Sequence, residues 1–148
     1  MGMRWTTVLG AGLLAGMLAQ PVLAKDIMVN MLTKGPGGLY VFQPAFVKAA
    51  VGDKIHFKPA DPSHNAETIG GMLPAGVAPQ KGAVGKEMVL TVSKPGVYGV
   101  ECLPHMSMGM VGLVQAGNGP SVNLASAKGV KLPPLAAKRM TPLLAQAK

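Results

Sequence analysis

Short apolar segments between glycines and prolines are the feature that most limits what this chain can fold into. The 148 residues include 20 glycines and 13 prolines, and many of them mark turns between the short segments. Pro44 cannot donate to a sheet, so we expect an edge or a bend there. Regularly spaced short strands with such turns predict an all-β sandwich or barrel. The expected strands cover residues 26–32, 39–49, 54–59, 86–93, 97–102 and 110–117.

The segment 118–148 has a different pattern. Start and stop signals predict a short helix over 120–128, and an Ala- and Leu-rich stretch with Lys and Arg on one side predicts a second over 133–148. Pro142 should kink the second helix or delay its start. Because a tail this short has no core of its own, we expect it to be an appendage of the domain formed by 25–117.

The first 24 residues have the pattern of an export signal. Arg4 lies in a short basic start, an apolar run follows over 8–19, and small residues at 22–24 precede a cleavage point. The apolar run is too short to cross ~30 Å of hydrocarbon comfortably. We therefore expect a signal peptide over 1–24 that is removed, and an exported, periplasmic protein over 25–148 with no membrane anchor.

The charge of the chain limits its partners. Its formal net charge is +8, or +7 once Arg4 is removed with residues 1–24, and this charge favours acidic partners. It has no interleaved basic and aromatic motif of the kind that binds nucleic acid, and nucleic acid is not expected outside the cytoplasm. We therefore expect no nucleic-acid partner.

Cys102 is the only cysteine of the chain. In an oxidising compartment it has no partner within the chain for a structural disulfide. The cysteine count leaves three interpretations open: metal ligation, an intermolecular disulfide and an inert buried thiol.

The neighbours of Cys102 favour a metal. Because side chains alternate across a strand, Tyr98, Val100 and Cys102 should share the inward face of 97–102. His105 follows three positions later. A thiol and an imidazole this close together suggest a transition metal, with copper first among the candidates.

A third ligand should come from elsewhere. His64 lies in the long loop 60–85, which can reach the same end of the sandwich, whereas His56 shares a strand face with lysines and should be a surface residue. Two imidazoles, one thiolate and a weak methionine describe a blue-copper site, whereas zinc would more often recruit further cysteines or a carboxylate. No histidine is left for a second copper cluster, which disfavours an enzyme. A copper chaperone or store, with Cu(I) held by the methionines of HMSMGM, remains the alternative to an electron carrier.

Three segments carry a resemblance to a known family: MLTKGPGGLYVFQPAFVKAAVGD, SHNAETIGGMLPAG and PGVYGVECLPHMSMGMVGLVQAG. With them the chain resembles the cupredoxins, and among these the pseudoazurin family, over essentially all of 25–148. The resemblance implies a cupredoxin-type Greek-key β-sandwich or barrel with two short C-terminal α-helices. It also implies a monomeric periplasmic type 1 (blue) copper protein that carries one electron between Cu(I) and Cu(II) and is not an enzyme.

The resemblance also implies roles for single residues. One copper per chain would be bound by His64, Cys102, His105 and Met110, and no residue would be catalytic. Asn65 would tie the two ligand loops together. Pro104, like Asn65, would lie beside the copper ligands. The surface around His105 would dock redox partners through Tyr40, Pro104, Met108, Lys34 and Lys81.

The partners implied by the resemblance are copper nitrite reductase or another periplasmic denitrification enzyme, and c-type cytochromes. The chain departs from the family pattern at Glu101, where lysine is frequent, at Pro62 and Ser63, where a lysine is missing, and at Tyr40, where methionine is common. These departures bear on partner choice, salt-dependent steering and the spectrum of the site more than on copper binding.

Overall fold

The computed structural model describes residues 1–2 and 23–148, so the predicted signal peptide lies almost entirely outside the described residues. The described chain forms eight strands, one 3-10 helix and two α-helices. In chain order they are β1 (Asp26–Gly35), β2 (Gly38–Gln43), β3 (Phe46–Ala49), β4 (Lys54–Pro59), β5 (Glu67–Thr68), β6 (Met88–Thr91), β7 (Gly96–Glu101), η1 (Leu103–Met108), β8 (Val111–Ala116), α1 (Leu124–Lys128) and α2 (Pro134–Gln146).

Two four-stranded sheets, ordered β2-β1-β4-β6 and β3-β8-β7-β5, form the molecule. In the first sheet, β1 pairs antiparallel with β2 and parallel with β4, and β4 pairs antiparallel with β6. In the second, β8 pairs parallel with β3 and antiparallel with β7, which pairs antiparallel with β5. The prediction of an all-β fold is confirmed, and its form is a sandwich of two open sheets.

The main core fills the space between the sheets. Phe42 and Phe57 from the first sheet meet edge to face there, with ring centroids 5.6 Å apart. Tyr98, Val100 and Cys102 face the same core from β7 and its end, as the alternation predicted. Because side chains alternate along β7, Cys102 at its end faces the interior of the sandwich.

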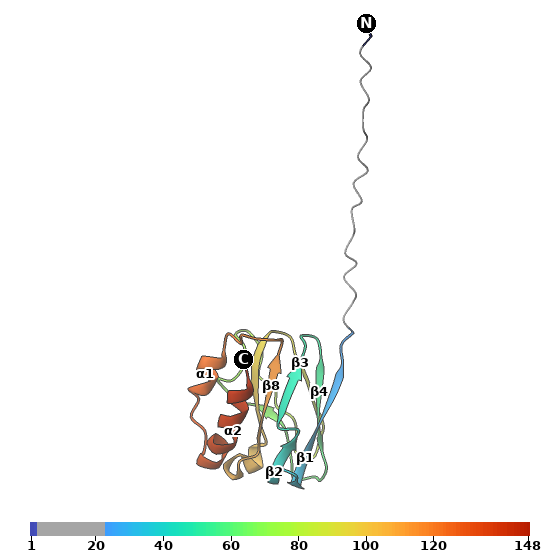
Figure 1. Ribbon diagram of the computed structural model, residues 1–148. Helices are drawn as coiled ribbons and strands as arrows, with labels where there is room; N and C mark the ends of the chain where they lie inside the picture. The colour runs from blue at the N-terminus through green and yellow to red at the C-terminus, as the bar shows by residue number, and fades with distance from the viewer. Residues whose placement is uncertain (3–22) are drawn as a thin grey trace.

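A second core lies on the outer face of the β3-β8-β7-β5 sheet, where α1 and α2 cover it (Figure 1). Met140 and Leu144 of α2 pack there against Val97 and Leu113 of the sheet. All six residues of β8 are buried because that strand has a covered face on both sides. The two C-terminal helices are thus packed against this sheet.

Pro142 does not delay the second helix, so that part of the prediction is wrong. α2 begins at Pro134 and continues through Pro142. The carbonyl that Pro142 leaves without a helical donor is that of Lys138, an exposed residue whose backbone can be hydrated.

The segment expected as one strand over 39–49 is two strands in different sheets. β2 ends at Gln43 and β3 begins at Phe46, so the chain crosses between the sheets at Pro44, where an edge or bend was predicted. β1 also extends to Gly35, three residues beyond the end of the strand expected over 26–32.

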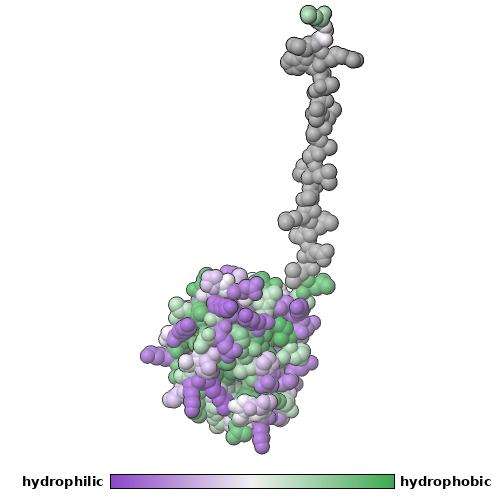
Figure 2. Space-filling view, in the orientation of Figure 1, coloured by the Kyte–Doolittle hydropathy of each residue, from purple (hydrophilic) through white to green (hydrophobic). Residues whose placement is uncertain are grey.

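Polar side chains are spread over the face of the domain seen in Figure 2, with smaller apolar areas between them. Within the described ranges, no helix has both the length and the apolar character needed to cross a membrane.

Candidate metal centre

The end of β7 brings a thiol and two imidazoles together. Cys102 ends the strand, His105 follows within η1, and His64 comes from the loop between β4 and β5. The Sγ atom of Cys102 lies 3.5 Å from Nδ1 of His105 and 3.9 Å from Nδ1 of His64, and the two Nδ1 atoms lie 3.2 Å apart. Within the described part of the chain, this is the one group of three or more His, Cys, Asp or Glu side chains whose ligand atoms lie within 4.8 Å of one another.

Cys102 is fully buried and makes no disulfide. Burial raises the pKa of its thiol, while the backbone N–H groups of Asn65 and His105 act in the opposite direction. Those two N–H groups favour the thiolate, which is the form that binds a metal. The thiol of Cys102 is thus buried, but two backbone hydrogen-bond donors are in place to stabilise its thiolate form.

The imidazole of His64 is held from its far side. Its Nε2 lies 3.1 Å from Oδ2 of Asp61 and 3.0 Å from Oγ1 of Thr33. The hydroxyls of Ser63 and Thr33 also donate to the Asp61 carboxylate and hold its pKa below the usual range. An ionised carboxylate beside Nε2 favours the tautomer with its proton on Nε2, which leaves the Nδ1 lone pair directed at Cys102 and His105.

His105 lies half-buried beside Tyr40. Their rings stack with centroids 4.3 Å apart and planes 25° from parallel. Burial and the neighbouring His64 lower the pKa of His105, while Asp61 acts in the opposite direction. His105 is therefore kept in the neutral form that can donate a nitrogen lone pair to a metal.

Asn65 connects the two loops that carry these residues. Its side-chain oxygen accepts a hydrogen bond of 2.8 Å from the Leu103 N–H, beside Cys102. Its amide nitrogen donates at 3.1 Å both to Oε2 of Glu67 and to the carbonyl of Gly82. These bonds join the loop that carries His64 to the residue that follows Cys102.

Met110 closes the loop that begins at Cys102. It is fully buried in the same core as the cysteine. Its carbonyl accepts from the Cys102 N–H at 3.0 Å, and its own N–H donates to the carbonyl of His105 at 3.1 Å. The backbone therefore places this methionine next to both residues.

The residues predicted for a docking surface have exposed or half-buried positions. Pro104 and Met108 are exposed on η1, and Lys34 is exposed on β1. Lys81 is also exposed, with Nζ 3.8 Å from Oε2 of Glu67. Tyr40 is half-buried against His105.

Some residues of this region have no signal in the sequence. Leu39 and Leu103, which are 55% and 50% exposed, add to the apolar surface near His105. Asp61, three positions before His64, could have been suspected as its partner. Thr33, which contacts His64, and Arg139, which donates to the Tyr40 carbonyl, come from distant parts of the chain. Their roles depend on the packing of separate elements.

His56 lies apart from this centre. Its Nε2 is 2.9 Å from Oδ1 of Asp26, and its Nδ1 is 2.6 Å from Oε1 of Glu87. These two hydrogen bonds raise the pKa of His56, that to Glu87 most. His56, on β4, thus links the first residue of β1 to the residue before β6 on the outer face of the first sheet.

The donor set fits copper. One thiol and two imidazole nitrogens within 4.8 Å of one another, with the buried Met110 in the same loop, match the preference of copper for soft sulfur and imidazole. The described residues of the centre add no further cysteine, which a structural zinc site would favour. The protein also fixes the far side of His64 with a carboxylate, as metal sites commonly do.

Comparison with known proteins agrees with this centre. The model of copper-binding proteins of the plastocyanin/azurin family matches residues 29–117. The chain is 52% identical over 136 residues to the pseudoazurin of Paracoccus pantotrophus, with 92% of each chain covered. It is 48% identical over 126 residues to the pseudoazurin of Methylorubrum extorquens, with 85% of this chain and 84% of the relative covered.

Solved structures show the same relation. The crystal structure of pseudoazurin from Methylobacterium extorquens AM1 matches with a TM-score of 0.78 at 49% identity and covers 82% of this chain and 98% of its own. That of native pseudoazurin from Hyphomicrobium denitrificans matches with a TM-score of 0.78 at 44% identity and covers 83% and 98%. The chain therefore belongs to the pseudoazurins, within the plastocyanin/azurin family of copper-binding proteins.

Proposed function

We propose that this pseudoazurin is exported to the periplasm after removal of residues 1–24 and passes single electrons to a denitrification reductase. Copper nitrite reductase is the acceptor that we favour, and a c-type cytochrome is a suitable donor. The copper would be bound by His64, Cys102, His105 and Met110. The observation that carries this proposal is the convergence of one buried thiol and two Nδ1 atoms within 4.8 Å.

The broader function follows from the family. As a pseudoazurin, the chain is a blue copper electron-transfer protein and not an enzyme. When bound, copper supplies the one-electron couple between Cu(II) and Cu(I).

The residues around the centre limit how far it can move. The Asp61 and Thr33 contacts fix the ring of His64, Tyr40 covers the ring of His105, and Asn65 ties their loops together. A site that barely moves needs little reorganisation when an electron enters or leaves. Rigid ligand side chains are thus the contribution that the protein makes to fast electron transfer.

The surface near His105 suits transient docking. Exposed apolar side chains at Leu39, Leu103 and Met108 lie on the elements that carry Tyr40 and His105. The formal net charge of +8 falls to +7 when Arg4 is removed with residues 1–24, and the remaining charge, which includes exposed Lys34 and Lys81, would steer an acidic partner toward the protein. We propose that electrons leave through His105, the half-exposed imidazole of the centre.

The visible spectrum tests the copper centre. Purified protein over 25–148 is loaded with Cu(II), reduced with ascorbate and reoxidised in air. We expect an intense band from charge transfer between the Cys102 thiolate and copper, which bleaches on reduction and returns in air. Cys102→Ser should remove the band, and His56→Gln, which lies outside the centre, should keep it. A colourless protein that releases Cu(I) readily would overturn the electron carrier and favour a copper chaperone or store.

Partner choice needs a separate measurement. Stopped-flow oxidation of the reduced protein by copper nitrite reductase should slow as salt is added, because the proposed steering is electrostatic. Lys81→Gln should weaken the salt dependence, whereas Lys128→Gln, a matched change on α1, should leave it almost unchanged. A rate independent of salt would refute this acceptor or this docking surface.

A further inference from the structure

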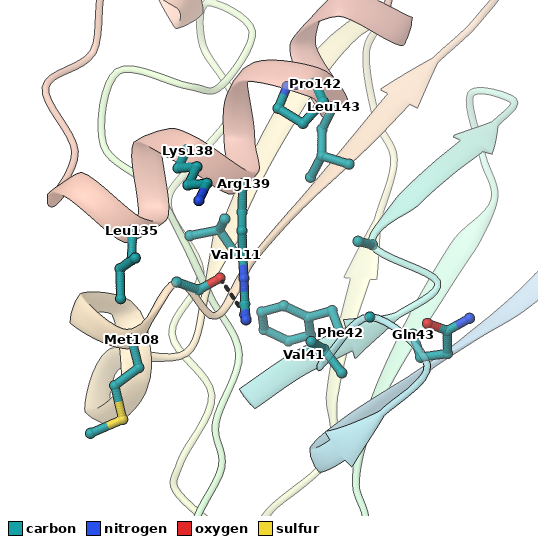
Figure 3. A pocket seen from close by; sticks show the side chains of 13 residues that line it. Val41, Phe42, Gln43, Met108, Val111, Leu135, Lys138, Arg139, Pro142 and Leu143 are labelled. Atoms are coloured by element: carbon teal, nitrogen blue, oxygen red, sulfur yellow. Dashed lines mark hydrogen bonds between the residues drawn. The ribbon is translucent and has the colours of Figure 1, made fainter. Parts of the chain in front are cut away.

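One arginine of the C-terminal helix reaches across to the metal centre. The guanidinium of Arg139 in α2 donates to three backbone carbonyls: Nη1 to that of Tyr40 at 2.7 Å and to that of Gly109 at 3.1 Å, and Nη2 to that of Leu39 at 2.9 Å. Figure 3 shows the side chain extending from α2 past Val111 toward β2, with its bond to the Gly109 carbonyl. The arginine thus bridges three elements that are far apart in the sequence.

Two of these carbonyls belong to the segment that covers His105. Within the described part of the chain, Tyr40 is the one residue other than glycine with a positive φ, at 52°. A bulky residue adopts this backbone only when its surroundings enforce it. The bonds from Arg139 to the carbonyls of Leu39 and Tyr40 hold this backbone, and the Tyr40 ring then lies 4.3 Å from that of His105.

The third carbonyl belongs to the residue before Met110. Gly109 has φ 87°, and a Cβ at this position would lie 2.9 Å from Cδ of Arg139 and 3.2 Å from the carbonyl oxygen of Leu135. The glycine is therefore required both by its backbone conformation and by the close approach of α2. The carbonyl that Arg139 holds is part of the peptide group that joins Gly109 to Met110.

We propose that Arg139 is a positioning residue of the metal centre, which sets both the stacking of Tyr40 on His105 and the position of Met110. The proposal rests on the proposed function. A guanidinium presents several donors in one rigid plane and can hold carbonyls from two segments at once. A lysine ammonium lacks this planar arrangement, so Arg139→Lys should not restore it. The C-terminal helix would thereby act on the redox properties of the centre, in addition to covering the sheet.

A purely structural role predicts something different. If Arg139 only attaches α2 to the sandwich, its loss should lower the midpoint of unfolding and leave the centre as it is in the folded protein. If it positions the centre, the folded variant should also have an altered ring stack, an altered visible spectrum and an altered reduction potential. These readouts separate the two roles.

The variants are Arg139→Met and Arg139→Lys, with Lys138→Met as the matched control, since Lys138 is an exposed cation at the neighbouring position. The first readout is NMR of the metal-free protein, which does not depend on copper. In wild type and in the Lys138 variant, we expect cross-peaks between the rings of Tyr40 and His105. In both Arg139 variants, we expect these cross-peaks to weaken and the Gly109 and Met110 amide signals to shift.

The second readout uses the copper-loaded protein. We expect a shifted reduction potential, altered relative intensities of the visible bands and about a 10-fold to 100-fold loss of copper affinity in both Arg139 variants. The Lys138 variant should match wild type in the spectrum and in affinity. Folded Arg139 variants with wild-type cross-peaks, spectrum and potential would overturn the proposal, even if they unfold at lower temperature.

Two further outcomes are informative. If wild type shows the ring cross-peaks but binds copper without a blue colour, the proposed function fails while the positioning of Tyr40 by Arg139 is still measured in the metal-free protein. If neither Arg139 variant folds, nitrogen-15 NMR of the wild-type guanidinium tests the three hydrogen bonds on which the proposal depends. Separate signals for Nη1 and Nη2 indicate the hindered rotation that three hydrogen bonds require, and one averaged signal would refute the proposal.

Discussion

Replacing Asn65 by alanine tests how strongly the two ligand loops are tied together. The side chain is 1% exposed and makes three hydrogen bonds, to the Leu103 N–H, to Glu67 and to the carbonyl of Gly82. Alanine has no group that can replace them. The Leu103 N–H and the Gly82 carbonyl, which make part-buried hydrogen bonds to Asn65, would then lose their partner.

The expected cost follows from these two backbone groups. A buried donor or acceptor left without a partner costs about 1 to 3 kcal/mol. Two of them give about 2 to 6 kcal/mol, and we expect Asn65→Ala to lower the free energy of unfolding by about 3 kcal/mol, because the cavity can admit some water. The carboxylate of Glu67 adds little, since it also has Lys81 nearby.

Urea unfolding of the metal-free protein measures this cost, and Asn118→Ala provides the control. Asn118 is exposed in the loop after β8, so its replacement should change stability by less than about 0.5 kcal/mol. Copper affinity of the Asn65 variant should also fall by about 10-fold to 100-fold. A loss of stability below about 1 kcal/mol, with an unchanged dependence on urea, would refute the view that Asn65 ties the loops together.

Two further predictions concern the rest of the sandwich. The pKa of His56 is raised by Glu87 and Asp26, so its contribution to stability is full below about pH 6.5 and is lost as pH rises through the higher folded pKa. Urea unfolding between about pH 6 and about pH 8 should therefore show a steeper fall for wild type than for His56→Gln, and equal slopes would contradict this. Buried Asn123 accepts from the Val97 N–H at 2.9 Å and donates to the Val97 carbonyl at 2.8 Å, so Asn123→Ala should cost about 2 to 4 kcal/mol in thermal or urea unfolding. A cost near zero would show that water replaces this pair.

Much of the fold could be predicted because its signals are local. Alternation within 97–102 placed Cys102 on the inward face, and the structure has it in the core with Tyr98 and Val100. Period and turn residues also located 54–59, where the observed strand has the same bounds. The division of the strand expected over 39–49 into two strands could not be predicted in the same way. Its two halves join different sheets, and a local pattern carries no information about which sheet a strand joins.

The donor set could be proposed from the sequence because few residues in the chain can bind a soft metal. One cysteine and three histidines leave few combinations, and strand alternation removed His56 from them. The side-chain orientations could not be proposed in this way. The ring of His64 is fixed by Thr33, which is 31 residues away in the sequence.

The sequence alone determined the class of fold and the kind of metal chemistry, because the period of side chains along a strand and the identity of donor atoms are properties of the residues themselves. Only the tertiary structure decided which nitrogen of His64 faces Cys102 and how Tyr40 lies on His105. The contact between Arg139 and Tyr40 was also decided only by the tertiary structure, since the two residues are separated by 99 positions in the sequence. Such contacts form when separate elements pack, and their specificity comes from distances that no local pattern records.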